Sequence, residues 1–281
     1  MRLVSFDTGS GPRAALLRDD RVYDIWGEAF AHVRHEDRTV FALLQGGLIH
    51  EVEAVEDEGV PVEGVPLLPP IARPNKIICI GLNYLSHAEE QGAEPPETPT
   101  FFAKYANALA APGATVPLPP WSEMVDYEAE VAFVIGSQCK DVPEERAMDH
   151  VAGYMLLNDL SARDYQFKTP QWMPGKVFDG AGPCGPALVT PDEAGPHDAI
   201  EVELRLNGEV MQQGSTADLV HSVPTLVTYL SKLMTLDPGD VISTGTPAGV
   251  GSLRDPKVWL KSGDEVAISS PQLGVLETRI A

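Results

Sequence analysis

Short alternations of apolar and polar residues begin the chain and predict a small unit of strands with one helix over residues 1 to about 58. The predicted strands are Arg2–Ser5, Ala14–Leu17 and Arg21–Asp24, with a turn at Asp19-Asp20. A proline-rich stretch follows from Gly59 to Pro74, and we expect an extended connector there because proline fixes φ and lacks an amide proton. The expected division is a small N-terminal α/β domain with this connector at 1–70 and a larger domain at 71–281.

From Lys76 onward the pattern is mainly that of strands. The predicted strands are Lys76–Ile80, Val151–Asn158, Glu201–Leu206, Glu209–Gln213, Val241–Ser243 and a final pair between Ser262 and Ile280. Asn207-Gly208 is a strong hairpin signal between two of them. One amphipathic helix follows Pro224, with an apolar face made of Leu226, Val227, Leu230, Leu233 and Met234. Because strands dominate and strict βαβ alternation is absent, we expect an α+β, mainly β protein of packed mixed sheets.

Two glutamates in the run Asp126–Ile135 are the most informative local feature. Glu128 and Glu130 leave the same face of a strand, with Cα atoms roughly 6 to 7 Å apart. Ala132 and Val134 continue that face, so the carboxylates lie at the edge of an apolar surface. Two like charges there are costly unless a cation lies between them, and a hard divalent cation takes several oxygen ligands. The alternative is that one or both acids are solvated on an edge strand.

Charge and cysteine content limit the classes of protein to which this chain can belong. Twenty basic against 41 acidic residues give a net charge of −21, which disfavours nucleic acid and anionic membranes as partners. A local cation can still reverse the potential in one cleft, so an anionic substrate is not excluded. The widely spaced Cys79, Cys139 and Cys184 predict free thiols rather than a zinc ribbon or a disulfide framework. Without a signal peptide or a long apolar run, we expect a cytoplasmic protein.

A third acid is placed to join the glutamates. Asp159 follows the predicted buried strand Val151–Asn158, and a helix is expected to begin after it, with Ser161 as N-cap and Asp164 completing a capping box. An aspartate between a strand and a helix start can direct its carboxylate inward beside the two glutamates. Three carboxylates without a nearby His or Cys favour Mg²⁺, Mn²⁺ or Ca²⁺ over zinc. The alternative is that Asp159 is a second capping residue.

The segment from Gly81 to Gly92 predicts a short helix with Asn83 as N-cap and the second glycine as its stop. His87 and Glu90 lie at i and i+3, so they share a face and can form a hydrogen bond. A carboxylate that holds an imidazole raises its basicity, which suits a general base acting on water. Two helical turns are marginal without tertiary support, so the segment could order over a substrate as a lid. An incidental surface pair is the alternative.

Four cationic or amide side chains are further candidates. Lys104 and Lys176 are embedded in apolar sequence, where an ammonium needs an anionic partner. A lysine stem that extends its charge to solvent is the ordinary alternative. Arg163 and Gln166, at i and i+3 on the predicted helix, can bind polar groups of a substrate or can be solvated.

The glycine-rich segment from Ser243 to Gly251 fits neither a Walker A motif nor a dinucleotide fingerprint. It could present backbone N–H groups and the Thr246 hydroxyl to an anion, or it could be a structural turn. The chain has no GxSxG sequence, so a serine nucleophile has no support.

Taken together and in this order, these segments resemble the fumarylacetoacetate hydrolase family in its shorter bacterial layout. The matching pieces are Gly81-Leu82-Asn83-Tyr84-x-x-His87-x-x-Glu90, Phe102-x-Lys104, Asp126-Tyr127-Glu128-x-Glu130, Asn158-Asp159-x-Ser161-x-Arg163-Asp164, Gly175-Lys176 and Thr244-Gly245-Thr246-Pro247-x-Gly249-Val250-Gly251. They extend from about residue 76 to the C-terminus. No single piece is decisive, but the ordered set is specific.

The resemblance implies a catalytic domain with a mixed β-sandwich or β-roll fold, in a homodimer. It implies Mg²⁺ or Mn²⁺ held by Glu128, Glu130 and Asp159. The implied catalytic residues are His87 with Glu90, as a dyad that activates water, and Lys176, as a cationic stabiliser. The residues implied to lie near the substrate are Lys104, Arg163, Gln166 and Thr246.

The resemblance also implies reactions of 2-oxo acids and 1,3-dicarbonyl acids. A substrate with adjacent carboxylate and keto oxygens can chelate a metal that acts as a Lewis acid, and Lys176 adds positive charge beside the enolate. Water delivered by His87 gives hydrolysis, so the dyad favours a C–C hydrolase of acylpyruvate-like or other diketo acids. A decarboxylase of oxaloacetate-type acids, or an isomerase or hydratase of dienoates, is the alternative. A protein with only a structural Ca²⁺ or Mg²⁺ site is a third hypothesis.

Overall fold

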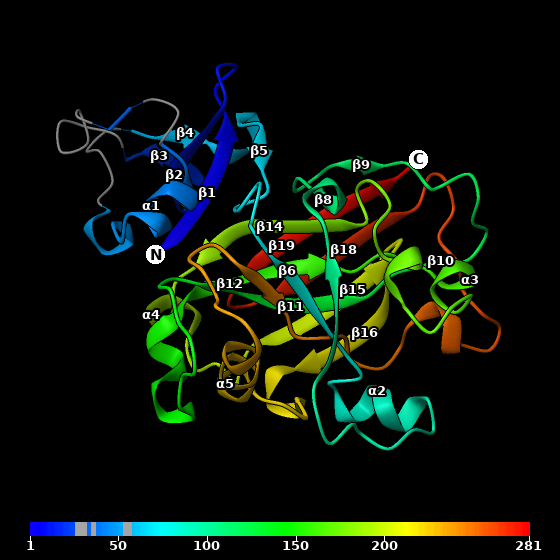
Figure 1. Ribbon diagram of the computed structural model, residues 1–281. Helices are drawn as coiled ribbons and strands as arrows, with labels where there is room; N and C mark the ends of the chain where they lie inside the picture. The colour runs from blue at the N-terminus through cyan, green and yellow to red at the C-terminus, as the bar shows by residue number, and fades with distance from the viewer. Residues whose placement is uncertain (26–32, 35–37, 53–57) are drawn as a thin grey trace.

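A computed structural model gives the fold and describes residues 1–25, 33–34, 38–52 and 58–281. Strands in mixed sheets make up most of its regular secondary structure, which confirms the predicted mainly β class (Figure 1). The largest sheet has the order β4-β3-β2-β1-β14-β12-β11-β17-β6-β7, with β5 paired to β1 and β8 to β14. Its strands are β1 (Arg2–Asp7), β2 (Pro12–Arg18), β3 (Arg21–Asp24), β4 (Val60–Pro61), β5 (Leu67–Leu68), β6 (Ile77–Gly81), β7 (Thr100–Lys104), β8 (Leu109–Ala110), β11 (Ala129–Ile135), β12 (Val151–Asn158), β14 (Gly182–Val189) and β17 (Val241–Ser243).

A second sheet packs against the middle of the first. Its order is β16-β15-β18-β19-β9, and β15, β18 and β19 contact β11, β12 and β14. The strands are β9 (Thr115–Val116), β15 (Glu201–Leu206), β16 (Glu209–Ser215), β18 (Glu265–Ser270) and β19 (Gly274–Ile280). Asn207 and Gly208 join β15 to β16 with φ of 51° and 83°, so the predicted hairpin turn has positive φ at both central residues. A separate two-stranded pair consists of β10 (Val125–Asp126) and β13 (Ser161–Ala162).

Helices are short and lie around the sheets (Figure 1). They are α1 (Val40–Gln45), α2 (Leu85–Glu90), α3 (Arg163–Gln166), α4 (Pro191–Ala194) and α5 (Val223–Leu233). The 3₁₀ turns are η3 (Ile49–Glu51), η4 (Val62–Gly64), η5 (Ala106–Ala108), η6 (Glu144–His150), η7 (Met173–Gly175), η8 (Thr216–Asp218) and η9 (Gly251–Leu253). In α5 the predicted apolar face is buried at Leu226, Val227 and Leu230, but Leu233 is 53% exposed, so the last turn departs from the prediction. No helix in the described ranges is long and apolar enough to cross a bilayer.

Alternation along β11 separates two apolar clusters. Val131 and Phe133 belong to a core that also contains Leu204 of the second sheet. Ala132 and Val134 point the other way and join a second cluster with residues of the N-terminal strands and α1. The face that carries Glu130 is therefore apolar further along the strand, as the sequence pattern predicted.

The N-terminal strands extend the large sheet. Strand β1 pairs antiparallel with β14, so backbone hydrogen bonds join the first segment of the chain to the larger unit. The proline-rich connector contributes only the two-residue strands β4 and β5, as expected for a segment poor in amide donors. The domain boundary at residue 70 stays a prediction.

Candidate active site

Pairing between β11 and β12 brings the three predicted acids together. Glu130 lies within β11, Glu128 immediately precedes that strand, and Asp159 immediately follows β12. The ladder ends with Ala129 opposite Asn158, and the Asp159 amide donates to the Glu128 carbonyl at 2.9 Å. All three carboxylates are buried, and one oxygen of each lies within 4.8 Å of the others. We call Glu128, Glu130 and Asp159 the acid triad.

Three cationic side chains surround the acid triad. Lys176 donates from Nζ to Glu128 Oε2 at 2.6 Å and to Asp159 Oδ2 at 2.9 Å. Lys104 donates to the other oxygen of Asp159 at 2.6 Å. Arg163 contacts Glu128 Oε1 at 2.7 Å and also pairs with Asp126. With Asp126 included, four buried carboxylates face three cations, so the cluster has one excess negative charge when all of these groups are ionised.

That excess charge is concentrated at Glu130. Its carboxylate accepts hydrogen bonds from the Ser243 hydroxyl and, at 3.3 Å, from the Gly245 amide, but no ion pair reaches it among the described residues. Burial, together with the charges of Asp159 and Glu128, raises its pKa well above the usual range. Glu128 differs: burial favours its protonated form, but the charges of Lys176 and Arg163 outweigh burial and lower its pKa to about 2.

The donor set fits a hard divalent cation. A buried carboxylate without a cationic partner, held close to two others, is a costly arrangement that a divalent ion relieves. The acid triad can therefore hold a divalent metal. Oxygen-only ligands favour Mg²⁺, Mn²⁺ or Ca²⁺ over zinc. With such an ion the cluster changes from one excess negative charge to one excess positive charge, which suits an anionic ligand.

Helix α2 holds the predicted dyad. His87 Nδ1 lies 3.2 Å from Glu90 Oε2, and the imidazole is largely buried. Glu90 uses its other oxygen to accept from the Gly249 amide at 2.9 Å, so the glycine-rich loop holds the carboxylate that orients His87. Gln91 contacts His87 Nε2 at 2.8 Å. The sequence did not indicate Gln91, because a single glutamine after a short helix carries no pattern.

One pocket of about 60 Å³ collects most of the candidates. Those that line it are His87, Glu128, Glu130, Asp159, Arg163, Gln166, Lys176 and Thr246. Glu90 and Lys104 do not line it; they contact His87 and Asp159, which do. Lys104 is buried and donates to Asp159 and to the Lys176 carbonyl, so it orients a carboxylate of the acid triad, and its predicted contact with a substrate stays a prediction.

Two aromatic side chains form a wall of this pocket: Phe102, from the motif Phe102-x-Lys104, and Trp172, which the sequence did not indicate. Phe102 lies under Lys176, with Nζ 5.1 Å from the ring centroid, and Trp172 packs edge-on against Phe102. The Trp172 ring also lies where a Cβ at Gly81 would be, at 2.2 Å, so only glycine allows this approach. Leu82, the next residue, has φ of 54°, an uncommon conformation for a bulky residue.

Two predicted helix caps are wrong. Helix α2 begins after Tyr84, and the Asn83 amide instead donates to the carbonyls of His221 and Thr244, which anchors β6 to the glycine-rich loop. Ser161 lies in β13 and donates to the Asp159 carbonyl. Asp164 accepts from Ser122 rather than closing a capping box. The partners of Asn83 and the pairing of Ser161 with Asp126 of β10 are long-range contacts that outcompete the local caps.

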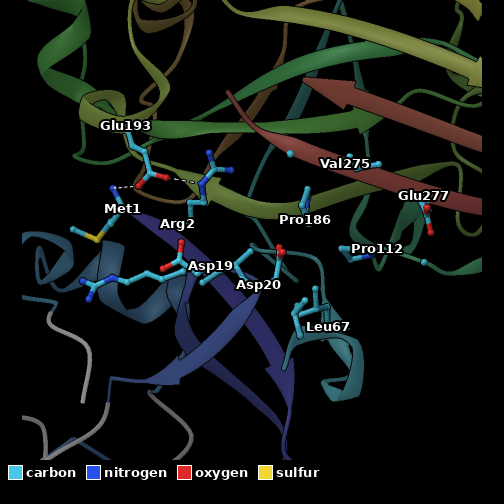
Figure 2. A pocket seen from close by; sticks show the side chains of 15 residues that line it. Met1, Arg2, Asp19, Asp20, Leu67, Pro112, Pro186, Glu193, Val275 and Glu277 are labelled. Atoms are coloured by element: carbon cyan, nitrogen blue, oxygen red, sulfur yellow. Dashed lines mark hydrogen bonds and ion pairs between the residues drawn. The ribbon is translucent and has the colours of Figure 1, made fainter. Parts of the chain in front are cut away.

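A separate cleft of about 880 Å³ lies between the N-terminal strands and β19 (Figure 2). Asp19 and Asp20 on one side face Val275 and Glu277 on the other, and Glu193 bonds Arg2 and the Met1 amine at one end. None of the predicted site residues lines this cleft. The chemistry therefore belongs to the smaller pocket at the acid triad.

The mixed β fold thus brings together a buried carboxylate triad that can hold a divalent metal, two lysines that contact the triad and a His–Glu dyad, which are the elements of an enzyme active site. The family model for the fumarylacetoacetate (FAA) hydrolase C-terminal region matches residues 76–281. The chain belongs to the fumarylacetoacetate hydrolase family, which confirms the resemblance.

Three relatives with different reactions are similar to this chain. A human mitochondrial oxaloacetate tautomerase is 44% identical over 223 residues, covering 78% of this chain and 71% of that protein. A 5-carboxymethyl-2-hydroxymuconate delta-isomerase from Mycobacterium smegmatis has a TM-score of 0.79 and 34% identity over 100% of this chain and 98% of its own. Maleylpyruvate hydrolase from Sphingobium sp. SYK-6, in complex with manganese(II) and pyruvate, has a TM-score of 0.77 and 28% identity, with 100% and 99% coverage.

Proposed function

We propose that this protein is a divalent-metal-dependent enzyme that forms and stabilises the enolate of a 2-oxo acid. The observation that carries the proposal is the placement of the acid triad, Lys176 and the His87–Glu90 dyad around one pocket. A divalent ion held by Glu128, Glu130 and Asp159 would supply Lewis acidity toward a keto carbonyl.

The leading reaction is keto–enol tautomerisation of an oxaloacetate-like acid. His87 removes a proton from the carbon beside the carbonyl, the C–H electron pair becomes the C=C bond, and the former carbonyl oxygen receives a proton. Glu90 orients the imidazole and balances its charge while it holds the proton. Lys176 places an ammonium near the developing enolate. The 44% identity to a tautomerase supports this reaction.

C–C hydrolysis of an acylpyruvate-like or other diketo acid is the second candidate. The dyad favours it, because His87 can take a proton from water that attacks the remote carbonyl. The C–C bond then breaks to give a carboxylic acid and the enolate of pyruvate, which is reprotonated. The hydrolase relative, which was solved with pyruvate, supports this alternative. Decarboxylation of oxaloacetate needs no attacking water and is a third outcome at the same pocket.

One set of assays tests the proposal and separates the reactions. With Mg²⁺ or Mn²⁺, a tautomerase accelerates the loss of enol absorbance of oxaloacetate while total oxaloacetate is conserved. A decarboxylase releases CO₂ from oxaloacetate, and a hydrolase releases acetate and pyruvate from acetylpyruvate. Glu130→Gln should lower the rate of whichever reaction the wild type catalyses by at least 100-fold. If the wild type accelerates none of these reactions, or if Glu130→Gln is as fast as the wild type, the proposal is wrong.

The remaining features are proposals as well. Mg²⁺ and Mn²⁺ are the proposed ions, a keto acid is the proposed partner, and the homodimer stays a prediction. The cytoplasmic location also stays a prediction, and the human relative, named as mitochondrial, does not support it.

A further inference from the structure

A second pocket adjoins the one at the acid triad. It has a volume of about 250 Å³ and shares His87, Gln91, Arg163 and Phe167 with the inner pocket. We call it the outer pocket. The inner pocket of about 60 Å³ holds only a few water-sized groups. A ligand that places its head at the acid triad and is longer than that head must therefore extend into the outer pocket.

The far wall of the outer pocket comes from the segment around η9, which lies beside α3 in Figure 1. Asp126 fixes this wall to the site, because its oxygens accept from the amides of Gly251 at 2.8 Å and Ser252 at 3.0 Å. The same carboxylate pairs with Arg163, which contacts Glu128 of the acid triad. The distance between the two pockets is thus set by a buried polar network.

Most of the outer pocket's lining is apolar and accessible. Leu253 is 41% exposed, Met124 is 43% exposed and Phe167 is 66% exposed, although large apolar side chains are usually covered. Trp259 adds an aromatic surface. Such walls suit the hydrocarbon part of a ligand rather than a chain that carries polar groups.

One cation in this lining has no anionic partner. Lys257 is exposed, its Nζ lies 5.9 Å from the centroid of the Trp259 ring, and it pairs with no carboxylate in the part of the chain that the structure describes. The other charged groups that line the pocket are already engaged: Arg163 by its acids, and Asp164 by the Ser122 hydroxyl. In a chain with a net charge of −21, an unpaired lysine beside the site is a distinctive anchor for an anion.

We propose that the outer pocket binds the distal part of a longer substrate that ends in a second carboxylate, with Lys257 pairing with that carboxylate. The substrate class is then a dianionic 2-oxo acid whose two acid groups are separated by an apolar chain. This inference rests on the proposed function, because the 2-oxo acid head must occupy the inner pocket. Lys257 would be a specificity-determining residue that does not touch the reacting atoms.

Two seven-carbon acids test the inference directly. Succinylpyruvate ends in a carboxylate, and butyrylpyruvate has the same length but ends in a methyl group. Wild-type protein with Mg²⁺ or Mn²⁺ should prefer succinylpyruvate in kcat/KM. Lys257→Gln should lower the ratio of the two kcat/KM values about tenfold, on the scale of one charge-assisted hydrogen bond. Lys257→Glu should lower it further.

Lys261→Gln is the matched control, because Lys261 is an exposed lysine on the same segment and does not line the outer pocket. It should leave the ratio unchanged. If Lys257→Gln also leaves the ratio unchanged while both acids react, the inference is wrong and the proposed function stands. If neither acid reacts, the proposed function fails for this class. In that case, binding is compared instead, by measuring how far each acid raises the melting temperature of the metal-loaded protein. If succinylpyruvate raises the melting temperature of wild type and Lys257→Gln equally, the inference is overturned.

Discussion

Lys104 and Asp159 form an ion pair that is entirely enclosed, with Nζ 2.6 Å from Oδ1 and both side chains at most 1% exposed. Lys176 takes the other oxygen of the same carboxylate. Asp159 is therefore held in one orientation by two lysines from different parts of the chain. This orientation keeps an oxygen of Asp159 within 4.8 Å of the carboxylate oxygens of Glu128 and Glu130.

Lys104→Met should weaken metal binding by 10- to 100-fold and reduce the free energy of unfolding by about 3 kcal/mol. The substitution leaves Asp159 with one lysine and removes a partner that orients a metal-ligating carboxylate. Titration calorimetry with Mn²⁺ and chemical denaturation measure the two effects. Lys261→Met, at an exposed position, should change the unfolding free energy by less than about 0.5 kcal/mol. Unchanged Mn²⁺ affinity in Lys104→Met would contradict this role.

Glu130→Gln should separate stability from metal binding. It removes the buried charge that no cation balances, so the metal-free variant should melt at least as high as the metal-free wild type. Added Mg²⁺ should stabilise the wild type, by about 2.7 kcal/mol at 100 times its Kd, but should no longer stabilise the variant. Thermal melts with and without EDTA give both values. Glu209→Gln, at an exposed strand position, is the control and should keep the full Mg²⁺ shift. Equal shifts in Glu130→Gln and wild type would exclude Glu130 as a ligand.

The dyad should show a graded loss of activity. His87→Gln should lower kcat by 100-fold or more, because the proton acceptor is lost. Glu90→Gln should lower kcat about tenfold, because the amide can still accept from Gly249 but no longer balances the charge on the imidazole. Steady-state kinetics on the active 2-oxo acid measures both.

Glu89→Gln provides the matched control for this series, since Glu89 is the exposed neighbour on the same helix. It should retain wild-type kcat. A Glu90→Gln variant that loses as much activity as His87→Gln, with the same KM, would show that Glu90 does more than position the imidazole.

The stability contribution of Lys76 should depend on pH. Lys76 donates to Asp237 at 2.7 Å and to Asp240 at 2.8 Å, which fastens the start of β6 to the turn before β17. Burial alone would lower the pKa of Lys76, but these hydrogen bonds raise it above 10.5, so the stabilisation is present below that pH and is lost as pH rises through the folded value. The Lys76 hydrogen bond lowers the pKa of Asp237 from 3.8, so its contribution is present above that pH and is lost as pH falls through the folded value.

Lys76→Met should therefore reduce stability by about 1 kcal/mol at pH 7, and the deficit should shrink toward pH 3. Melting curves of wild type and variant in metal-free buffer at both pH values test this. A deficit of the same size at pH 3 and pH 7 would indicate lost packing rather than lost ion pairing.

The sequence determined much of this protein by local rules. Strand alternation put Glu128 and Glu130 on one face, because successive side chains point to opposite sides of a strand. The Asn207-Gly208 turn and the strand Val151–Asn158 depended on backbone preference and continuous hydrophobicity, and both are present. The ordered motifs indicated the family, which the match over residues 76–281 shows.

Only the tertiary structure decided the rest, because Asn83 and the segment at Ser161 pair with parts of the chain that are distant in sequence, namely the loop at Thr244 and strand β10. Asn83 and Ser161 are good caps by local energy, but Asn83 binds the loop at Thr244 and Ser161 is drawn into β13 by pairing with Asp126 of β10. The apolar sequence around Lys104 indicated only that its ammonium needs an anion, and the fold places Asp159 against it. The Trp172 wall and the outer pocket with Lys257 arise from segments that share no local pattern with the acid triad, and aromatic packing and the hydrogen bonds to Asp126 bring them to it.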